Sequence, residues 1–352
     1  MNTKKLGSSD LVVPAITLGT MTWGNQNSES EAHQQLGYAV DERGLYFIDT
    51  AEMYAVPPSK QTQGRTESYI GNWLKKRGKR EDLIIASKVS ISDNIVTRDI
   101  DLPPRYDRTS IRQAVEGSLK RLQTDYIDLY QVHWPERYSN FFGVRGFDQL
   151  HNDEQFVPIE EVLSYMSELV DEGKIKHIGI SNESPWGLAE YLRVPREKNL
   201  SKIVSIQNQY SMTNRTFEIG LAEMVLRENI GMLAYSPLGM GALTGKYLDG
   251  HKPTGARLTI YPDGGRVDNR YNPNRAQIAI KRYVELARDH GMDPATLAIG
   301  FVSSRQFVTS TIIGATDLNQ LKTDIDAGEV ELSEDILTEI EKIHEDMPNV
   351  TH

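Results

Sequence analysis

The sequence predicts an α/β protein with the (β/α)8 TIM-barrel fold. Short apolar runs alternate with segments of helical period along the chain. Eight such runs are present, and each is continuously apolar rather than alternating, which is typical of parallel strands buried on both faces. Eight is also the number of strands at which a parallel sheet commonly closes into a barrel.

The eight predicted strands follow one another in barrel order. They are Ala15–Gly19, Tyr46–Asp49, Leu83–Lys88, Ile127–His133, Ile175–Ser181, Ile203–Gln207, Gly231–Tyr235 and Val308–Ile313. No Gly/Ser-rich or Pro-rich linker interrupts the alternation, so we expect residues 1–352 to form a single domain.

Helical periods fill most of the segments between these strands. They cover Glu29–Arg43, Glu67–Lys76, Ile159–Glu172, Gly220–Glu228, Ala276–Asp289 and Leu318–Ile325. Another helix is predicted to begin with a capping box at Ser110-Ile-Arg-Gln113. Outside the repeat, we expect an N-terminal β-hairpin over Leu6–Val13 at the barrel bottom. A C-terminal helix at about 333–344 should have Ser333 as its N-cap.

Three connections are too long for plain loops between a strand and a helix. They cover Val89–Thr109, Trp134–Pro158 and Ser236–Arg275, and loops longer than roughly 12–15 residues are usually functional or disordered. All three follow strands, which places them on the C-terminal face where barrel enzymes carry their catalytic residues. We expect them, with Trp23 and Trp134, to form the walls of a substrate pocket.

Composition excludes several classes of function. The 39 basic residues against 49 acidic ones give a formal charge of −10, which argues against nucleic-acid binding. The absence of cysteine excludes disulfides, zinc–thiolate sites and iron–sulfur clusters. None of the eight histidines lies within five residues of another, so we predict no metal site. Without an apolar leader or membrane span, we expect no membrane association and a cytoplasmic protein.

Polar residues close three successive predicted strands. Asp49, Lys88 and His133 stand at these ends, and Tyr54 follows Asp49 by five residues. Taken singly, each has a structural explanation: an Asp can cap a helix, a Lys can neutralise a buried carboxylate, and a His can be a satisfied core residue. Taken together at one end of a barrel, the four side chains indicate a catalytic site.

These residue types suit the reduction of a carbonyl group. Hydride addition places negative charge on the carbonyl oxygen, which then needs a proton donor and a second hydrogen-bond donor. Tyr54 can donate the proton, but a phenol with an ordinary pKa of about 10 needs a nearby cation to stabilise its phenolate. Lys88 would be that cation, held in place by Asp49. His133 would orient the carbonyl oxygen through an imidazole N–H.

Several motifs resemble the signature of the aldo-keto reductase family in order and spacing. They are Asp49-Thr-Ala-Glu-Met-Tyr54, Ser87-Lys88, Tyr130-Gln-Val-His133-Trp-Pro135 and Ile178-Gly-Ile-Ser-Asn182. Two later segments are similar to the family's pyrophosphate and adenosine-end segments: Tyr235–Tyr247, and Gly314-Ala-Thr316 with Gln320. The resemblance extends over nearly the whole chain.

The resemblance implies an oxidoreductase with a catalytic tetrad of Asp49, Tyr54, Lys88 and His133. It also implies a small carbonyl compound as substrate and NADPH extended across the barrel top, with Tyr235 stacked on the nicotinamide. The implied cofactor contacts are Thr20, Met21, Asp49, Ser181, Asn182, Gln207, Tyr235, Ser236, Pro237, Leu238, Gly239, Gly241, Lys246, Arg257, Gly314, Thr316, Gln320 and Asp324.

Two features depart from the pattern of the family at large. Ala55–Gln63 intervenes between Tyr54 and the turn Gly64-Arg-Thr-Glu67, and this insertion resembles the bacterial Tas branch of the family. Asp324 stands where related members place Asn beside the adenosine. Because a carboxylate at that position repels a 2′-phosphate, Asp324 opposes a preference for NADPH.

A basic segment favours NADPH instead. Residues 245–275 carry six basic and three acidic residues, a net charge of +3. The basic residues are Lys246, Lys252, Arg257, Arg266, Arg270 and Arg275. We expect Arg257 in particular to bind the 2′-phosphate, which would make NADPH bind more tightly than NADH.

Two other functions are compatible with these residues. The chain also resembles potassium-channel β subunits over the same barrel, so it could be a nucleotide-binding regulatory or interaction protein. Alternatively, Lys88 could form a Schiff base in an aldolase. The sequence does not predict the identity of the carbonyl substrate or the oligomeric state.

Overall fold

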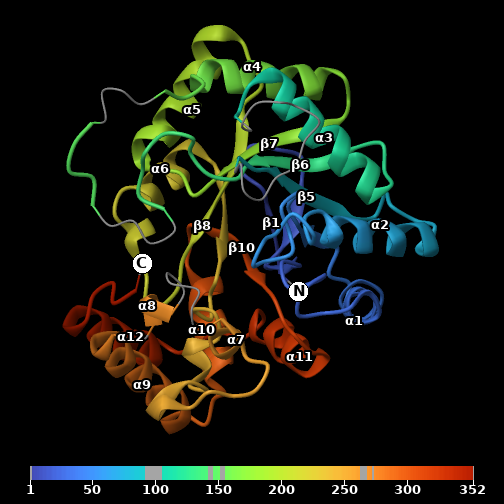
Figure 1. Cartoon of the computed structure of the whole chain (residues 1–352). Helices are drawn as coiled ribbons and strands as arrows, with labels where there is room; N and C mark the ends of the chain where they lie inside the picture. The colour runs from blue at the N-terminus through green and yellow to red at the C-terminus, as the bar shows by residue number, and fades with distance from the viewer. Residues whose placement is uncertain are drawn as a thin grey trace.

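The computed structural model describes residues 2–91, 105–141, 146–150, 155–261, 268–271 and 273–351. Within these residues, eight parallel strands close into a barrel in the order β10-β3-β4-β5-β6-β7-β8-β9, and helices surround it (Figure 1). The strands are β3 (Ile16–Gly19), β4 (Phe47–Asp49), β5 (Ile84–Val89), β6 (Ile127–Val132), β7 (Ile175–Ser181), β8 (Ile203–Gln209), β9 (Gly231–Tyr235) and β10 (Val308–Ile313). Each overlaps one predicted strand, so the (β/α)8 prediction is confirmed.

The helices between and after the strands follow the predicted order. They are α1 (Glu29–Leu36), which continues as a π-helix (Gly37–Glu42), α2 (Arg65–Arg77), α3 (Arg108–Leu122), α4 (Ile159–Asp171), α5 (Pro185–Lys198), α6 (Leu221–Glu228), α9 (Asn274–Asp289), α10 (Pro294–Ser304), α11 (Leu318–Ala327) and α12 (Glu334–Asp346). The C-terminal helix α12 has Ser333 as its N-cap, as predicted.

Two of the longer helices, α5 and α10, were absent from the prediction for identifiable reasons. In α5, Pro195 lies inside the helix and weakens its helical signal. In α10, nearly every residue from Ala295 to Val302 is buried. A helix that is apolar on all sides has no amphipathic period to reveal it.

The predicted capping box of α3 is wrong by almost one turn. The helix begins at Arg108, and its N-cap is Asp107, whose carboxylate accepts the backbone N–H of Ser110 at 2.9 Å. Asp is as good an N-cap as Ser. Ser110 therefore lies within the first turn, fully buried.

A hairpin closes the bottom of the barrel, as predicted. Strands β1 (Thr3–Lys5) and β2 (Val12–Pro14) pair in antiparallel fashion. Leu6 and Val13 are fully buried and pack with apolar side chains from inside the barrel, such as Phe47. The end of the barrel opposite the candidate site is therefore a packed apolar layer.

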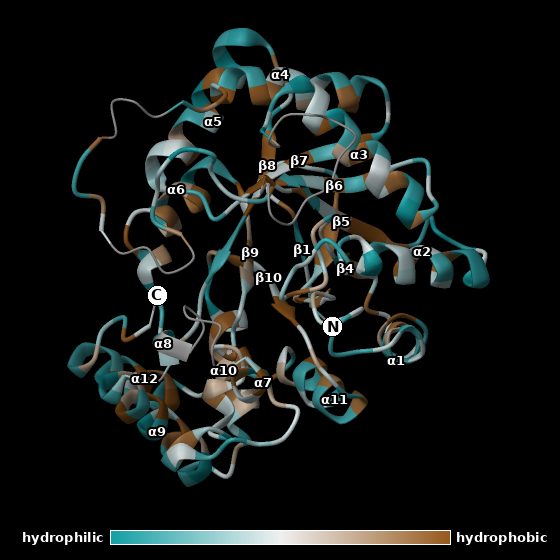
Figure 2. Cartoon of the chain, in the orientation of Figure 1, coloured by the Kyte–Doolittle hydropathy of each residue, from teal (hydrophilic) through white to brown (hydrophobic). Residues whose placement is uncertain are grey.

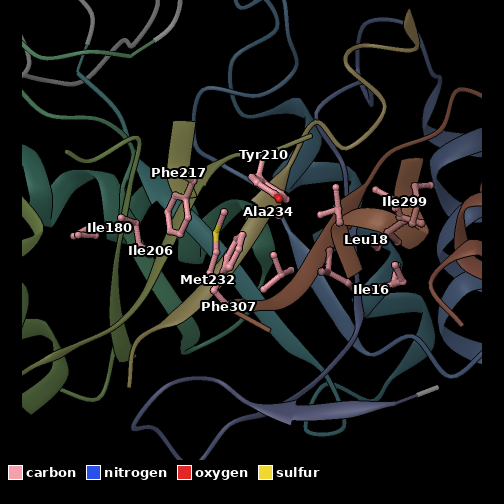
Figure 3. Packing of buried hydrophobic residues seen from close by; sticks show 14 of the residues in the cluster. Ile16, Leu18, Ile180, Ile206, Tyr210, Phe217, Met232, Ala234, Ile299 and Phe307 are labelled. Carbon is pink, nitrogen blue, oxygen red and sulfur yellow. The ribbon is translucent and has the colours of Figure 1, made fainter. Parts of the chain in front are cut away.

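The strands contribute to two separate apolar clusters. In β4, Phe47 belongs to the cluster inside the barrel, whereas the next residue, Ile48, belongs to the cluster between barrel and helices. Figure 3 shows this second cluster around Ile206 and Met232. Hydrophobic residues concentrate in the strands, while the surrounding helices carry both hydrophobic and hydrophilic residues (Figure 2). Successive strand residues therefore alternate between the barrel interior and the helices.

The three predicted long connections are described in part. Residues 92–104, 142–145, 151–154, 262–267 and 272 lie outside the described residues. The last connection contains the short helices η3 (Ala242–Thr244), η4 (Leu248–Gly250), α7 (Arg257–Ile260) and α8 (Asp268–Tyr271). No helix in the described ranges is long and apolar enough to cross a bilayer.

Gly71 is a site where packing of α2 on α3 tolerates no side chain. A Cβ at this position would overlap the carbonyl oxygen of Arg121 at the end of α3. We expect Gly71→Ala to lower the free energy of unfolding by about 1–3 kcal/mol, because backbone must move. Gly37→Ala is the control, since a Cβ there meets nothing within 4 Å. Urea denaturation measures both variants, and equal stability of the two would contradict the packing argument.

Candidate active site

Because strand residues point alternately into the barrel and toward the helices, a set of polar side chains lies inside the C-terminal end of the barrel. Asp49 lies two residues after the inward-facing Phe47 on β4, and Lys88 lies two residues after the inward-facing Ala86 on β5. Each therefore points into the barrel, one layer above the apolar interior. Gln131 of β6 holds the equivalent position, two residues after Leu129.

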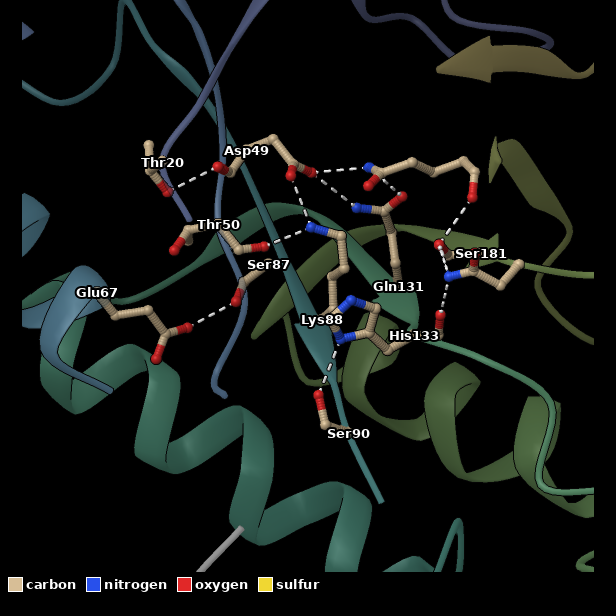
Figure 4. Close-up of polar contacts among 12 residues, drawn as sticks. Thr20, Asp49, Thr50, Glu67, Ser87, Lys88, Ser90, Gln131, His133 and Ser181 are labelled. Carbon is tan, nitrogen blue, oxygen red and sulfur yellow. Dashed lines mark hydrogen bonds and ion pairs between the residues drawn. The ribbon is translucent and has the colours of Figure 1, made fainter. Parts of the chain in front are cut away.

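A buried ion pair forms the centre of the site (Figure 4). The Lys88 ammonium donates to Asp49 Oδ2 at 2.6 Å and to the carbonyl oxygen of Thr50 at 2.7 Å, and Lys88 is completely buried. The other oxygen, Asp49 Oδ1, accepts Gln207 Nε2 at 2.8 Å and Gln131 Nε2 at 3.3 Å. Both carboxylate oxygens thus have partners, as a buried charge requires.

Burial and charge act in opposite directions on Lys88. Burial lowers the pKa of its ammonium, whereas the charges of Asp49 and Glu67 raise it. Glu67 of α2 approaches from outside the barrel, where it accepts Ser87 Oγ at 2.6 Å and pairs with Arg121 at 2.7 Å. A second buried carboxylate therefore supports the positive charge of Lys88 from behind the sheet.

Tyr54 lies next to this ion pair. Its ring centroid is 5.1 Å from the Lys88 ammonium nitrogen, and it packs in a small cluster with Met53, Met21 and Trp134. Burial raises the pKa of the Tyr54 phenol, the charge of Asp49 raises it further, and Arg257 lowers it. The sequence predicts Lys88 as the cation that eases this ionisation. Lys88 lies next to the ring while paired with Asp49, and Arg257 adds a second positive charge that acts on Tyr54.

His133 faces Tyr54 from the end of β6. The ring centroids are 6.0 Å apart, with planes at 70°. Burial, and then the charge of Lys88, lower the pKa of His133 well below its usual value, so the imidazole is neutral at pH 7. Its Nδ1 lies 2.9 Å from the Ser90 hydroxyl.

A second network connects the ends of β7, β8 and β9. The Tyr235 hydroxyl donates to Asn182 Oδ1 at 2.6 Å, and Asn182 Nδ2 donates to the His133 carbonyl oxygen at 2.8 Å and to Ser181 Oγ at 3.0 Å. Ser181 Oγ in turn donates to the carbonyl oxygen of Gln207 at 2.7 Å. The predicted contacts on these three strands therefore lie side by side around His133.

The remaining predicted contacts form the rim of the same face. Thr20, after β3, donates to the Asp49 carbonyl oxygen at 2.8 Å. The turns from Ser236 to Gly241, which include Pro237, Leu238 and Gly239, follow β9 and carry several positive φ angles. Gly314 and Thr316 follow β10, and Thr316 donates from its N–H and its hydroxyl to Gln320 of α11.

Lys246 and Asp324 lie within electrostatic reach of each other at this rim. Burial lowers the pKa of Lys246, while the charges of Asp324 and Asp317 raise it. Asp324 is 3% exposed, and its pKa is raised to about 7 by burial and by the charge of Asp293, with Lys246 opposing and Asp317 adding to the rise. The cation beside Asp324 is therefore Lys246, whereas Arg257 contacts the sulfur of Met21 at 3.7 Å.

The prediction that two tryptophans form pocket walls is wrong for Trp23. Trp23 is completely buried, and its indole N–H donates to Gln35 of α1 at 3.1 Å. It is a packing residue between barrel and helix. Trp134 lies against His133, with ring centroids 4.8 Å apart, and remains part of the site.

Sequence reasoning missed three residues that hold the site together. Gln131 binds Asp49, Glu67 supports Lys88 through Ser87, and Ser90 contacts His133. Gln131 had a signal, because it lies two residues before His133 and so on the same face of its strand. The contacts of Glu67 and Ser90 depend on tertiary packing and had none.

The donor set of this face fits a nicotinamide nucleotide. Asn182 and Gln207 bring side-chain amides to this face. Both amide nitrogens already donate within the protein, so their oxygens are the groups that can accept hydrogen bonds from a carboxamide NH2. The phosphates would meet the glycine-containing turns after β9 and the partly buried Lys246. Among the described residues, no group of His, Asp or Glu side chains could hold a metal ion.

Comparisons with known proteins show which sequences this chain is similar to. A sequence profile described as the Aldo/keto reductase family matches residues 15–345. The chain is 49% identical over 345 residues to Protein tas of Escherichia coli (strain K12), covering 98% of both chains. It is 31% identical over 336 residues to the uncharacterized oxidoreductase YrpG of Bacillus subtilis (strain 168), covering 94% of this chain and 92% of that protein. A probable aldo-keto reductase 1 of Glycine max is 30% identical over 341 residues, covering 96% and 87%.

Removal of the Lys88 charge alone should destabilise the barrel. Lys88→Met leaves the buried Asp49 carboxylate with two amide donors and no cation, and we expect a loss of about 3–5 kcal/mol in the free energy of unfolding. Asp49→Asn combined with Lys88→Met removes both charges and should recover much of that loss. Urea denaturation of the two variants tests the pair, and a double variant no more stable than Lys88→Met would contradict this account.

Proposed function

The chain belongs to the aldo/keto reductase family, and from that premise we propose that it reduces aldehydes or ketones to alcohols with NADPH, with Tyr54 as general acid. The observation that carries this proposal is the meeting of Tyr54, the Lys88–Asp49 ion pair and a neutral His133 at one end of the barrel. Oxidoreductase activity on carbonyl compounds is characteristic of the family.

His133 binds the carbonyl oxygen of the substrate. Because its pKa is far below the usual value, the ring keeps one proton. When Ser90 donates to Nδ1, that proton is on Nε2, which is free to donate to the substrate. A neutral donor polarises the carbonyl group without competing with Tyr54 as the acid.

Tyr54 delivers the proton. NADPH, when bound, would supply a hydride to the carbonyl carbon. The Tyr54 hydroxyl would give its proton to the carbonyl oxygen. Burial makes the phenolate that remains unfavourable, so nearby positive charge is needed in the transition state. Lys88, 5.1 Å from the ring, and Arg257 supply that charge.

The rest of the face would hold the nucleotide. Asn182 and Gln207 would bind the carboxamide, and Tyr235 would stack on the nicotinamide. The turns from Ser236 to Gly241 would carry the diphosphate. Lys246 would bind the 2′-phosphate, assisted by Thr316 and Gln320.

The geometry of Lys88 argues against the aldolase alternative. Its ammonium is completely buried and donates to Asp49 and to Thr50. A Schiff base requires a neutral amine that can reach the substrate. The regulatory alternative remains a hypothesis that turnover measurements decide.

Tyr54→Phe tests the general acid. The variant keeps the ring and loses the proton, so kcat for aldehydes should fall by at least ~100-fold while the Kd for NADPH stays nearly unchanged. Tyr46→Phe is the control, because that hydroxyl bonds the Val12 carbonyl oxygen at the opposite end of the barrel. Stopped-flow kinetics and nicotinamide fluorescence measure the two constants.

The same experiment extends to Lys88. If the two residues act in one step, adding Tyr54→Phe to Lys88→Met should cost little more than either change alone. Losses in kcat that simply multiply would mean independent roles. Wild-type protein that binds NADPH but turns over no aldehyde or ketone would support the regulatory alternative instead.

Asp324 should make the nucleotide preference depend on pH. With a pKa of about 7, its carboxyl is mostly neutral below pH 7 and charged above it, and the charged form repels a 2′-phosphate. Relative to Asp324→Asn, the wild-type preference for NADPH over NADH should therefore fall as the pH rises from about 6 to 8. The variant should keep the higher preference throughout.

The nearby Asp326→Asn is the matched control, because this exposed residue of the same helix pairs with Arg43. Calorimetric titration with 2′,5′-ADP and 5′-ADP isolates the 2′-phosphate. The phosphate also titrates, with a pKa of about 6, but equally in all three proteins. Identical pH profiles for the wild type and Asp324→Asn would remove Asp324 from the nucleotide site.

A further inference from the structure

Two arginines over the candidate site have no carboxylate partner within the described part of the chain. Arg270 of α8 is 7% exposed, and its Nε finds no hydrogen-bond acceptor there. Among the described residues, the hydrogen-bond acceptor of the Arg257 guanidinium of α7 is the Met21 sulfur, a weak acceptor, at 3.7 Å. By contrast, the buried Arg137 binds both carboxylate oxygens of Glu183. The charges of Arg257 and Arg270 are therefore unpaired among the described residues.

Tyr271 and Gln209 bring two more polar groups to the same place. Tyr271 is fully buried with its ring against Gly239, where a Cβ would lie 2.9 Å from the ring. The Tyr271 hydroxyl and the Gln209 side chain lie near each other. Among the described residues, neither the hydroxyl nor the Gln209 nitrogen meets an acceptor or donor in good hydrogen-bond geometry. Burial raises the pKa of the Tyr271 phenol, whereas the two arginines and Gln209 lower it. Arg257, Arg270 and Gln209 therefore all act on the Tyr271 hydroxyl.

We call these four side chains the roof cluster: Gln209, Arg257, Arg270 and Tyr271. The cluster lies beside the reaction centre, because Arg257 contacts Met21, which packs in the cluster of Tyr54. Gln209 is also the register partner of Tyr235 between β8 and β9. Burial raises the pKa of Tyr235, and Arg270 lowers it. Arg257 has the same effect on Tyr54, against burial and the charge of Asp49. A ligand that binds the roof cluster is therefore within electrostatic reach of both hydroxyls.

A buried guanidinium without an acceptor is costly unless a ligand supplies the acceptor. An oxyanion satisfies this need best, because a guanidinium donates two parallel hydrogen bonds to a carboxylate or phosphate. We propose that Arg270, with the Tyr271 hydroxyl and the Gln209 amide, binds an oxyanion beside Tyr54 and Tyr235, with Arg257 as the second positive charge.

The oxyanion has two chemical sources, and the inference rests on the proposed function. It is either the carboxylate of an acidic aldehyde or ketone, or the diphosphate of the nucleotide. The first source makes Arg270 a determinant of substrate specificity. The second makes it a residue of the cofactor site. Both sources share the same recognition chemistry, so the experiment has one arm for each.

The substrate arm compares 4-carboxybenzaldehyde with its neutral methyl ester. These aldehydes react at the same group and differ by one negative charge. In Arg270→Gln, the ratio of kcat/KM for the acid to kcat/KM for the ester should fall at least ~10-fold, the expected loss of a charged hydrogen bond. Arg270→Lys should recover part of this ratio, because lysine restores the positive charge but not the two parallel hydrogen bonds of a guanidinium.

The nucleotide arm measures Kd for NADPH and for inorganic pyrophosphate in the same variants by titration. Here a diphosphate ligand predicts a rise of at least ~10-fold in both constants in Arg270→Gln, with an unchanged substrate ratio.

Two further variants control both arms. Arg275→Gln removes an exposed positive charge of the same connection and should change neither the ratio nor the two Kd values. Tyr271→Phe removes only a buried hydroxyl that lacks a hydrogen bond among the described residues, so it should fold normally and still weaken whichever anion binds. Thermal unfolding of Arg270→Gln should show no loss of stability, because the native charge is unpaired.

A fall in the substrate ratio assigns the roof cluster to an acidic substrate, and a rise in both Kd values assigns it to the diphosphate. Either result supports the oxyanion site. If neither quantity changes in Arg270→Gln, the inference is overturned. Wild-type protein that reduces no carbonyl compound would overturn the proposed function instead, and the nucleotide arm alone would then decide the roof cluster.

Discussion

The ion pair between Lys88 and Asp49 is the constraint on which the C-terminal face depends. Both charges are buried inside a closed barrel, so they need hydrogen-bond partners from the protein. Gln131 and Gln207 donate hydrogen bonds to the Asp49 carboxylate, and the Thr50 carbonyl oxygen accepts one from the Lys88 ammonium. These partners come from different strands. The ion pair therefore has all its hydrogen bonds only when the barrel is closed, and the closed barrel accommodates the two charges only with these partners.

The same pair explains why much of the site could be predicted from sequence. In a parallel barrel the interior is apolar, and a polar residue on the inward face is tolerated only in the last layer of the strand. Asp49, Lys88 and His133 obey this rule, and the resemblance of their motifs to a known family assigned them roles. Gln131 follows the rule as well. It was not predicted because it lies two residues before His133, the residue that ends its predicted strand.

Other parts of the molecule lie beyond such rules for physical reasons. Buried helix α10 has no polar face, and α3 begins at Asp107 because an Asp competes with Ser as an N-cap. Trp23 resembles a pocket residue in sequence, yet its indole N–H finds Gln35 under α1. Arg270 and Tyr271 lie in a long connection without a period, and only tertiary structure brings them over β8 and β9.

Buried charges that have ion-pair partners differ in function from buried charges that lack them. Lys88, Asp49 and Glu67 are compensated within the protein, so they can be held in place whether or not a ligand is present. Arg270 and Asp324 are almost as deeply buried and have no ion pair among the described residues. A protein retains the free-energy cost of a buried unpaired charge where a ligand offsets it or where function requires it.

Arg270 lies beside the reaction centre, whereas Asp324 lies at the rim with Lys246. The two unpaired charges can therefore act on different ends of one extended ligand or on separate ligands. The compensated charges therefore belong to the chemistry that the family shares, and the uncompensated ones are where this chain can set its own choice of substrate and nucleotide.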